Sequence, residues 1–250
     1  MFIDTHCHIS KDDYEDVETV IKKAKENNVG TLLLCGCDKK GIKEAIEIAK
    51  SHDNIYLEIG YHPSETNTTT DEDLEELKKL AQNPKVVAIG EIGLDYHWEK
   101  ENKEEQKKLF RKQINIAKEL KLPIVIHTRD AFQDTYDILK EENHYGDIHC
   151  FSGNKENAKM YISLGYYLGI GGVLTFKNTN LTETLKDIPL ERILLETDCP
   201  YLTPEPYRKE KNEPMYIPVI AKKISEVLDK DINEVEKTIC NNTITLFKLK

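Results

Sequence analysis

Four histidines and two carboxylates in this chain are of the types that bind metal ions in proteins. They are His6, His8, Glu91, His127, His149 and Asp198. Imidazole and carboxylate are ligands of Zn²⁺, and carboxylate also suits harder ions such as Mn²⁺ and Mg²⁺. Two neighbouring cations activate water and stabilise the attacking and leaving oxygens of a displacement. The set therefore predicts hydrolysis at a two-metal centre.

The spacing of the first two histidines supports a single shared cavity. His6 and His8 are separated by one residue, and residues two apart in extended backbone project to the same face. Taken alone, each of the six residues could be an ordinary packing or ion-pairing group. However, burying these imidazoles and carboxylates together without a cation would cost free energy, because the groups lose their hydration and the carboxylates repel one another. The complete set therefore favours metal binding.

We expect two divalent cations, which could be Zn²⁺, Mg²⁺ or Mn²⁺. One cation is assigned to His6, His8 and Asp198 and the other to His127 and His149, with Glu91 as the bridge. Asp198, beside both a cation and its water, is the candidate general base. Closed structural zinc sites are usually rich in thiolate, so the absence of cysteine from this set indicates an open, catalytic site.

Three further residues are candidates for substrate binding. Arg129 follows His127 by two residues, and Arg208 lies in the segment after the last predicted strand. Either guanidinium could neutralise a substrate phosphate or could form an ordinary surface ion pair. His62, in the segment Gly60-Tyr61-His62-Pro63, is a candidate hydrogen-bond donor to substrate.

Short apolar runs supply the elements that would position these side chains. Most of the runs lack polar alternation, which is typical of strands buried on both faces of a parallel sheet. The predicted strands are 1–5, 31–35, 55–59, 86–90, 124–127, 147–151, 166–169 and 192–196. The six candidate ligands fall at or near the carboxyl ends of five of them.

Amphipathic stretches separate the strands. The predicted helices are 14–27, 39–50, 71–82, 103–120, 131–142, 155–164, 181–186, 217–228 and 232–249. The helix at 181–186 has the weakest pattern, because Gly171-Gly172 and Asn178-Thr179-Asn180 enrich that region in loop residues. Eight strands alternating with helices predict one α/β domain over residues 1–250, a TIM-type (β/α)8 barrel, whose strand ends meet at a single mouth.

Charge and hydropathy narrow the possible partners. The 35 Lys and Arg residues against 45 Asp and Glu residues give a net charge of −10, which argues against a broad basic surface for nucleic acid. Bound cations could still supply positive charge locally. The chain opens without a signal-peptide pattern, and its apolar runs are too short to cross a bilayer. We expect a cytoplasmic monomer with no membrane partner.

The six cysteines are expected to be free thiols in a reducing compartment. Cys35-Gly36-Cys37 has neither CxxC nor zinc-finger spacing, so we interpret it as packing at a strand end. Cys7 and Cys150 flank candidate ligands. Because side chains alternate along a strand, both thiols should point away from the cavity.

Six ordered blocks of the chain resemble the TatD-type metal-dependent deoxyribonucleases of the amidohydrolase superfamily. The blocks are FIDTHCH (2–8), GYHP (60–63), AIGEIGLDY (88–96), LPIVIHTR (122–129), HCFSG (149–153) and LETDCPYLTP (195–204). The resemblance implies a TIM barrel, divalent metal dependence and hydrolysis of phosphodiester bonds in DNA from a 3′ end. Its metal ligands would fall on the same six residues.

One segment departs from the pattern of that family. The family usually has Pro-Tyr-Arg-Gly-Lys-Arg-Asn-Glu-Pro, whereas residues 206–214 are PYRKEKNEP. The glycine is replaced by Lys209, and the acidic Glu210 follows it. We expect this change to affect the binding and choice of substrate and not the metal ligands.

Two other functions compete with deoxyribonuclease activity. The same cations could activate water against a small ester, amide or lactone, and the negative net charge favours a small substrate over a long polyanion. A binding protein that has lost turnover is the third alternative. An open site with a candidate base argues against it.

Overall fold

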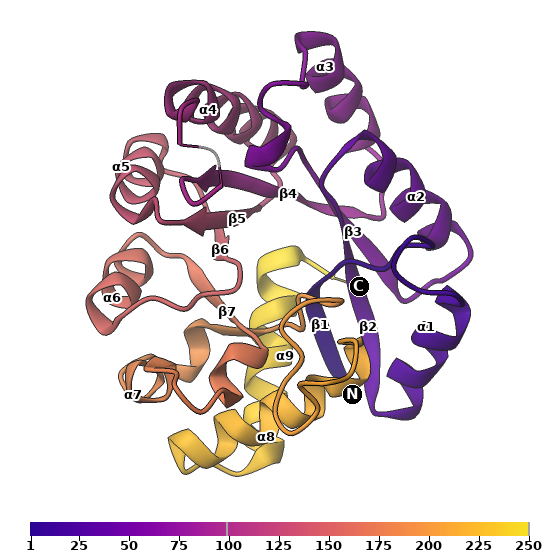
Figure 1. Ribbon diagram of the computed structural model, residues 1–250, viewed down its shortest axis with the longest axis vertical. Helices are drawn as coiled ribbons and strands as arrows, with labels where there is room; N and C mark the ends of the chain where they lie inside the picture. The colour runs from indigo at the N-terminus through magenta and orange to yellow at the C-terminus, as the bar shows by residue number, and fades with distance from the viewer. Residues whose placement is uncertain (99, 250) are drawn as a thin grey trace.

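The computed structural model describes residues 1–98 and 100–249, and its eight strands form one parallel sheet curved into a barrel (Figure 1). The strands are β1 (Phe2–Cys7), β2 (Val29–Gly36), β3 (Ile55–Ile59), β4 (Val86–Asp95), β5 (Ile124–Arg129), β6 (Gly146–Ile148), β7 (Tyr167–Ile170) and β8 (Ile193–Leu195). Each strand pairs with the next in sequence order. The barrel is nearly closed between β8 and β1, where the Asp198 N–H donates to the His6 carbonyl at 3.0 Å. The predicted (β/α)8 fold is confirmed.

Helices surround the sheet and fill the connections between strands (Figure 1). They are α1 (Val17–Glu26), α2 (Lys39–Lys50), α3 (Asp71–Leu80), α4 (Lys103–Leu120), α5 (Phe132–Glu142), α6 (Lys155–Ser163), α7 (Leu181–Leu185), α8 (Ile217–Leu228) and α9 (Ile232–Phe247). The weakly patterned seventh helix is present but has only five residues. Within residues 1–98 and 100–249, no helix combines the length and apolar character that a membrane crossing requires.

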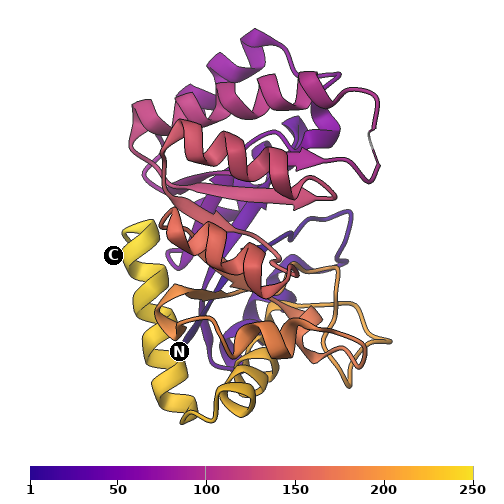
Figure 2. The ribbon, with the colours of Figure 1, turned by 90° about the vertical axis from the view of Figure 1, so that its left-hand side faces the viewer.

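The apolar strand residues divide between two faces of the barrel wall. On β2, Leu32 and Leu34 belong to the large core that includes the helices, whereas Leu33 belongs to a smaller cluster. That smaller cluster contains residues of β1, β2, β4, β5 and β8 together with Leu246 and Phe247 of α9. Since side chains alternate along a strand, the smaller cluster fills the barrel interior. In Figure 2, α9 lies on the opposite side of the molecule from the long loops that follow the strands. It therefore closes the amino end of the barrel.

The same alternation positions the functional residues. Leu33, Val125 and Leu194 are interior residues of β2, β5 and β8. Two positions further along the chain come Cys35 on β2, His127 on β5 and, directly after the end of β8, Glu196. The barrel interior therefore changes from apolar at the end covered by α9 to ionisable at the carboxyl ends of the strands.

Several strand ends differ from the predictions, and the differences at β4 and β6 change where two ligands lie relative to their strands. The predicted strand 86–90 continues to Asp95, because Ile92 and Leu94 are buried and pair with β5. Glu91 therefore lies inside β4, at a shift of register, and not at the strand end. Conversely, β6 ends at Ile148, so His149 follows the strand and does not lie on it.

Candidate metal centre

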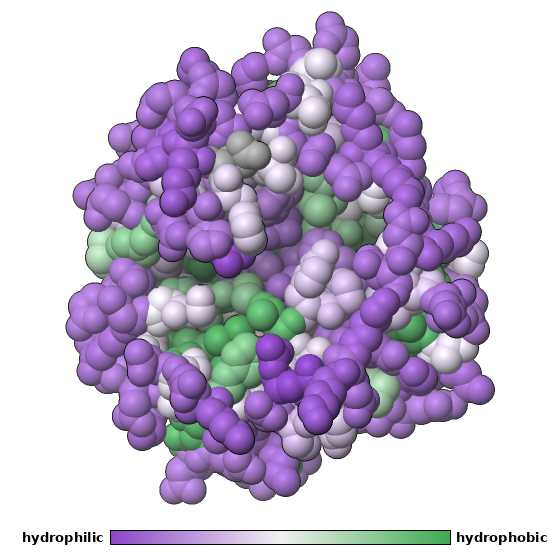
Figure 3. Space-filling view, viewed as in Figure 1, coloured by the Kyte–Doolittle hydropathy of each residue, from purple (hydrophilic) through white to green (hydrophobic). Residues whose placement is uncertain are grey.

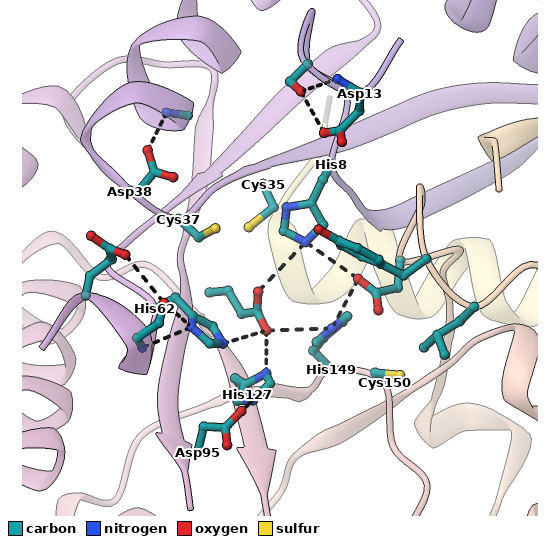
Figure 4. Close-up of a pocket in the computed structure, with 18 of the residues that line it drawn as sticks. His8, Asp13, Cys35, Cys37, Asp38, His62, Asp95, His127, His149 and Cys150 are labelled. Atoms are coloured by element: carbon teal, nitrogen blue, oxygen red, sulfur yellow. Dashed lines mark hydrogen bonds and ion pairs between the residues drawn. The ribbon is translucent and has the colours of Figure 1, made fainter. Parts of the chain in front are cut away.

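The rings of His8, His62, His127 and His149 gather around one cavity (Figure 4), and the carboxylate of Glu91 lies within 4.0 Å of each of them. Its Oε1 is 2.7 Å from Nδ1 of His127 and 3.8 Å from Nε2 of His149. Its Oε2 is 3.8 Å from Nε2 of His6 and 3.8 Å from Nε2 of His8. The two oxygens of one carboxylate therefore face different pairs of imidazoles, as a bridging ligand requires.

Asp198 completes the cluster from the β8 side. Its Oδ1 is 3.5 Å from Nε2 of His8, 3.7 Å from that of His149 and 3.9 Å from that of His6. Two ligands that are each about 2.0–2.2 Å from one cation cannot lie more than about 4.4 Å apart, and all these distances meet that limit. The structure thus brings all six predicted ligands together. His149 faces both Glu91 and Asp198, so it lies between the two groups of ligands.

Three buried carboxylates that sequence reasoning missed contact the far nitrogens of the imidazole rings. The contacts are Glu58 Oε1 to His6 Nδ1 at 2.6 Å, Asp95 Oδ2 to His127 Nε2 at 3.1 Å, and Glu196 Oε1 to His149 Nδ1 at 3.2 Å. A carboxylate beside one ring nitrogen favours the proton on that nitrogen. The other nitrogen faces the cavity, where a bound cation would replace the proton that the raised pKa of His127 and of His149 places there in the bare protein. Carboxylate–histidine–metal arrangements use this pattern.

The pKa values of Glu91 and of the imidazoles around it indicate that the site favours bound positive charge. Burial raises the pKa of this carboxyl, but the surrounding imidazoles, with His127 first, bring it well below its usual range. For His127, burial lowers the pKa, whereas Glu91 and Asp95 outweigh burial and raise it to about 9. The site therefore attracts positive charge strongly even as a bare protein. Lone pairs and carboxylate oxygens directed at one cavity form a donor set suited to divalent cations.

His62 and Arg129 both line the pocket around the ligands. Nδ1 of His62 accepts a hydrogen bond from the Ser64 backbone N–H at 3.1 Å. Burial lowers the pKa of His62 to about 4, so its ring is neutral and its proton lies on Nε2. Nε2 lies 4.0 Å from Glu91 Oε1, at the edge of the cluster. His62 can therefore donate a hydrogen bond into the pocket.

The two arginines have different surroundings. No carboxylate in residues 1–98 or 100–249 forms an ion pair with Arg129, whose guanidinium lies 5.5 Å from the centre of the Trp98 ring. Arg208 instead donates to the Thr203 carbonyl at 2.8 Å and stacks 4.0 Å from the Phe176 ring centre. Arg208 is not among the residues that line the pocket. The structure thus brings Arg129 to the site and leaves Arg208 in its own loop.

The segment that departs from the family pattern is held by internal contacts. The Tyr216 hydroxyl donates to Glu210 Oε2 at 2.5 Å, and the Thr203 hydroxyl donates to the Glu210 carbonyl at 2.8 Å. Neither Lys209 nor Glu210 lines the pocket.

The cysteines near the ligands only partly follow the predictions. Cys7 points away from the cavity and donates to the Leu33 carbonyl, as expected. Cys150 was expected to do the same but lines the pocket, because it follows β6 with a φ of 47° and the strand alternation no longer applies there. Cys35 is buried at the end of β2, as the packing interpretation expects, but both Cys35 and Cys37 also line the pocket. Hydrogen bonds with Cys35 and His8 lower the pKa of Cys37 to about 6.

The ligands open into a cavity of about 990 Å³. Its face of the molecule is hollowed near the centre, with hydrophobic residues bordering the hollow and hydrophilic residues around them (Figure 3). The segments after β1, β2 and β3 supply five acidic residues to the lining and form its acidic arm: Asp12, Asp13, Asp38, Glu44 and Glu65. The only basic residue in this arm among the described residues is Lys40, which is paired with Asp12. Arg129 and the exposed ring of Trp98 lie on another wall.

The barrel and its cluster of imidazoles and carboxylates define a metal-dependent hydrolase. The model of the family described as TatD related DNase matches residues 3–248. The chain therefore belongs to the TatD family.

Similar proteins of known sequence or structure support this family assignment. An uncharacterized metal-dependent hydrolase, YabD, from Bacillus subtilis (strain 168) is 44% identical over 254 residues, covering 100% of both chains. YcfH from Escherichia coli (strain K12), another uncharacterized metal-dependent hydrolase, is 35% identical, covering 99% of this chain and 96% of YcfH. The crystal structure of the TatD homolog YjjV from Escherichia coli K12 superimposes with a TM-score of 0.93 at 28% identity, covering 100% of this chain and 98% of YjjV.

Proposed function

We propose that this protein hydrolyses phosphodiester bonds of DNA, removing nucleotides from a 3′ end. The observation that carries the proposal is the position of Arg129, which lines the same pocket as the metal ligands and forms no ion pair within residues 1–98 and 100–249. A guanidinium without a carboxylate partner is available for a phosphate oxygen, to which it can donate two hydrogen bonds.

The rest of that wall suits a nucleotide. The Trp98 side chain is 72% exposed although tryptophan is large and apolar, and its ring contacts Arg129 and His97. An exposed aromatic ring beside a cation is the combination that binds single-stranded nucleic acid, through base stacking and phosphate contact. Tyr201, which is 60% exposed, lies near His8 and offers a second ring.

The described side chains can support hydrolysis as follows. Cations at the cluster would activate water and neutralise the phosphate charge. Asp198 is the more open of the two cluster carboxylates, with its side chain 13% exposed against 6% for Glu91. Within residues 1–98 and 100–249, no hydrogen bond or ion pair involves its Oδ2, which leaves that oxygen to accept the proton of the attacking water. The P–O3′ bond then breaks, the His62 Nε2–H can donate a hydrogen bond to the departing oxygen, and that oxygen takes up a proton from solvent to become the new 3′-hydroxyl.

The acidic arm of the cavity favours a second candidate function. Asp12, Asp13, Asp38, Glu44 and Glu65 would repel a polyanion that extended along this arm. A small ester, amide or lactone would leave the arm empty or fill it with a neutral or cationic group. On the proposed function, a DNA strand therefore follows the wall of Arg129 and Trp98 and avoids the acidic arm.

One experiment separates the two candidates. Nucleotide release from 3′-labelled and 5′-labelled single-stranded DNA is measured with Mg²⁺, Mn²⁺ or Zn²⁺, beside a panel of esters, amides and lactones. Metal-dependent release of the 3′ label by the wild type, lost with chelator and in Asp198→Asn, supports the proposal. Cleavage of the small substrates alone, by a folded and metal-loaded protein, would overturn it.

A further inference from the structure

Cys35 lies among the metal ligands and not merely near them. A nitrogen of His6, a nitrogen of His8, a carboxylate oxygen of Glu91 and Sγ of Cys35 all lie within 4.8 Å of one another. Figure 4 shows the Cys35 side chain beside the His8 ring, next to Cys37. A Zn–S bond of about 2.3 Å and a Zn–N bond of about 2.0–2.1 Å allow at most about 4.4 Å between the two ligand atoms, so a bound cation would draw this group together by a few tenths of an ångström at most.

The backbone fixes this orientation. Leu33 on β2 belongs to the cluster inside the barrel, and Cys35 is the next residue of that strand on the same face. Cys35 of β2 pairs with Glu58 of β3 in the sheet. Glu58 in turn contacts His6, so the pairing places Cys35 next to the residue that holds this ligand. Cys35 is 7% exposed, so little freedom remains for its thiol to turn to solvent.

The other cysteines near the site do not occupy an equivalent position. Cys150 groups with His149 and Glu196 but not with Glu91, and Figure 4 draws its sulfur directed away from the cluster. Cys37 lies beside Cys35 and lines the pocket, but it is not part of the group formed by His6, His8 and Glu91. Cys37→Ser is therefore the control for a neighbouring thiol that also contacts His8, and Cys150→Ser is the control for a thiol outside the group.

We propose that Cys35 is an additional, thiolate ligand of the cation held by His6 and His8, and that it makes this half of the centre selective for Zn²⁺ over Mg²⁺ and Mn²⁺. Thiolate is a soft ligand that Zn²⁺ and Co²⁺ accept, whereas Mg²⁺ and Mn²⁺ prefer oxygen. On binding, the S–H bond breaks, the sulfur lone pair forms the bond to the cation, and the proton leaves to solvent. The proposal rests on the metal dependence of the family and not on DNA as the substrate.

Cobalt substitution tests the ligand directly, without any activity assay. The full chain is loaded with Co²⁺, the bound metal is counted, and the near-ultraviolet absorption from sulfur-to-cobalt charge transfer is recorded. We expect the band in the wild type, its retention in Cys37→Ser and Cys150→Ser, and its loss in Cys35→Ser. A cobalt-loaded wild type without the band would overturn the proposal, as would a band lost in Cys37→Ser and kept in Cys35→Ser.

Calorimetry tests the selectivity and does not depend on the spectrum. We expect Cys35→Ser to weaken Zn²⁺ binding more than about tenfold and to release one proton fewer per Zn²⁺ bound, as measured in buffers of different ionisation enthalpy. Mn²⁺ affinity should stay within about twofold of the wild type, which also shows that the site of the variant is folded. Equal losses for Zn²⁺ and Mn²⁺ would contradict a soft ligand.

Discussion

Oε1 of Glu58 lies 2.6 Å from Nδ1 of His6, and both side chains are almost completely buried. Glu58 belongs to β3 and His6 to β1, so this contact joins two strands that are not neighbours in the sheet. Burial raises the pKa of Glu58 well above its usual range in the bare protein, and a cation at Nε2 of His6 would favour the ionised Glu58 carboxylate facing a proton on Nδ1.

We expect Glu58→Gln to lower Zn²⁺ affinity about 10–100-fold, the usual effect of losing a partner of this kind. The amide has nearly the same shape but no charge to favour the proton on Nδ1. Zn²⁺ titration by calorimetry measures the effect, and circular dichroism checks that the fold is unchanged. Glu183→Gln, at an exposed position of α7, is the control. Equal Zn²⁺ affinity in the two variants would show that Glu58 has no positioning role.

A second prediction follows from the bridging position of Glu91. Its two oxygens face different imidazole pairs, so Glu91→Ala should lower the occupancy of both cations together. Metal counted per chain after dialysis against Zn²⁺ gives the result directly. A variant that still bound two cations normally would contradict the bridge, and one that lost a single cation would assign Glu91 to that cation alone.

Much of this site could be predicted because its ligands follow simple spacing. His6 and His8 share a face of extended backbone, and apolar strand runs placed the remaining ligands near the mouth of the barrel. The exact end of β4 could not be predicted, because the register shift at Glu91 is set by pairing with β5, far along the chain. Nothing local to Glu91 distinguishes a strand end from a bulge.

Glu58, Glu196 and Cys35 were missed for another reason. Each is a buried ionisable or polarisable residue; Glu58 and Cys35 lie on strands, and Glu196 directly follows β8, two positions beyond the interior residue Leu194. An acid within an otherwise apolar strand was a usable signal, since burying a carboxylate without a partner is costly. Reading the alternation through Leu33 to Cys35 would also have placed that thiol in the cavity. The partner that each residue contacts, however, depends on how the strands are arranged around the barrel.

The two arginines provide a matched pair for substrate binding. Arg129→Ala should raise KM for single-stranded DNA about tenfold or more, since a charge-assisted contact contributes about 1.5–3 kcal/mol, while metal content stays unchanged. Arg208→Ala removes the same charge outside the pocket and should leave KM near the wild-type value. Steady-state kinetics on the same labelled strand compares them. Equal KM values in Arg129→Ala and the wild type would show that the Arg129 guanidinium does not contact the substrate.

Metal removal should destabilise the fold as well as abolish activity. Without cations, Glu91, Asp198 and the buried imidazoles face one another with only protons to balance their charge. A ligand at about 100 times its dissociation constant stabilises the folded state by about 2.7 kcal/mol, which for a chain of this size raises Tm by roughly 5–10 °C. Chelator should therefore lower Tm of the wild type by about that amount, as followed by thermal unfolding. In Glu91→Ala the chelator-induced shift should be smaller, because fewer cations are bound before chelation. Equal shifts in the two proteins would mean that the stabilising cation binds elsewhere in the chain.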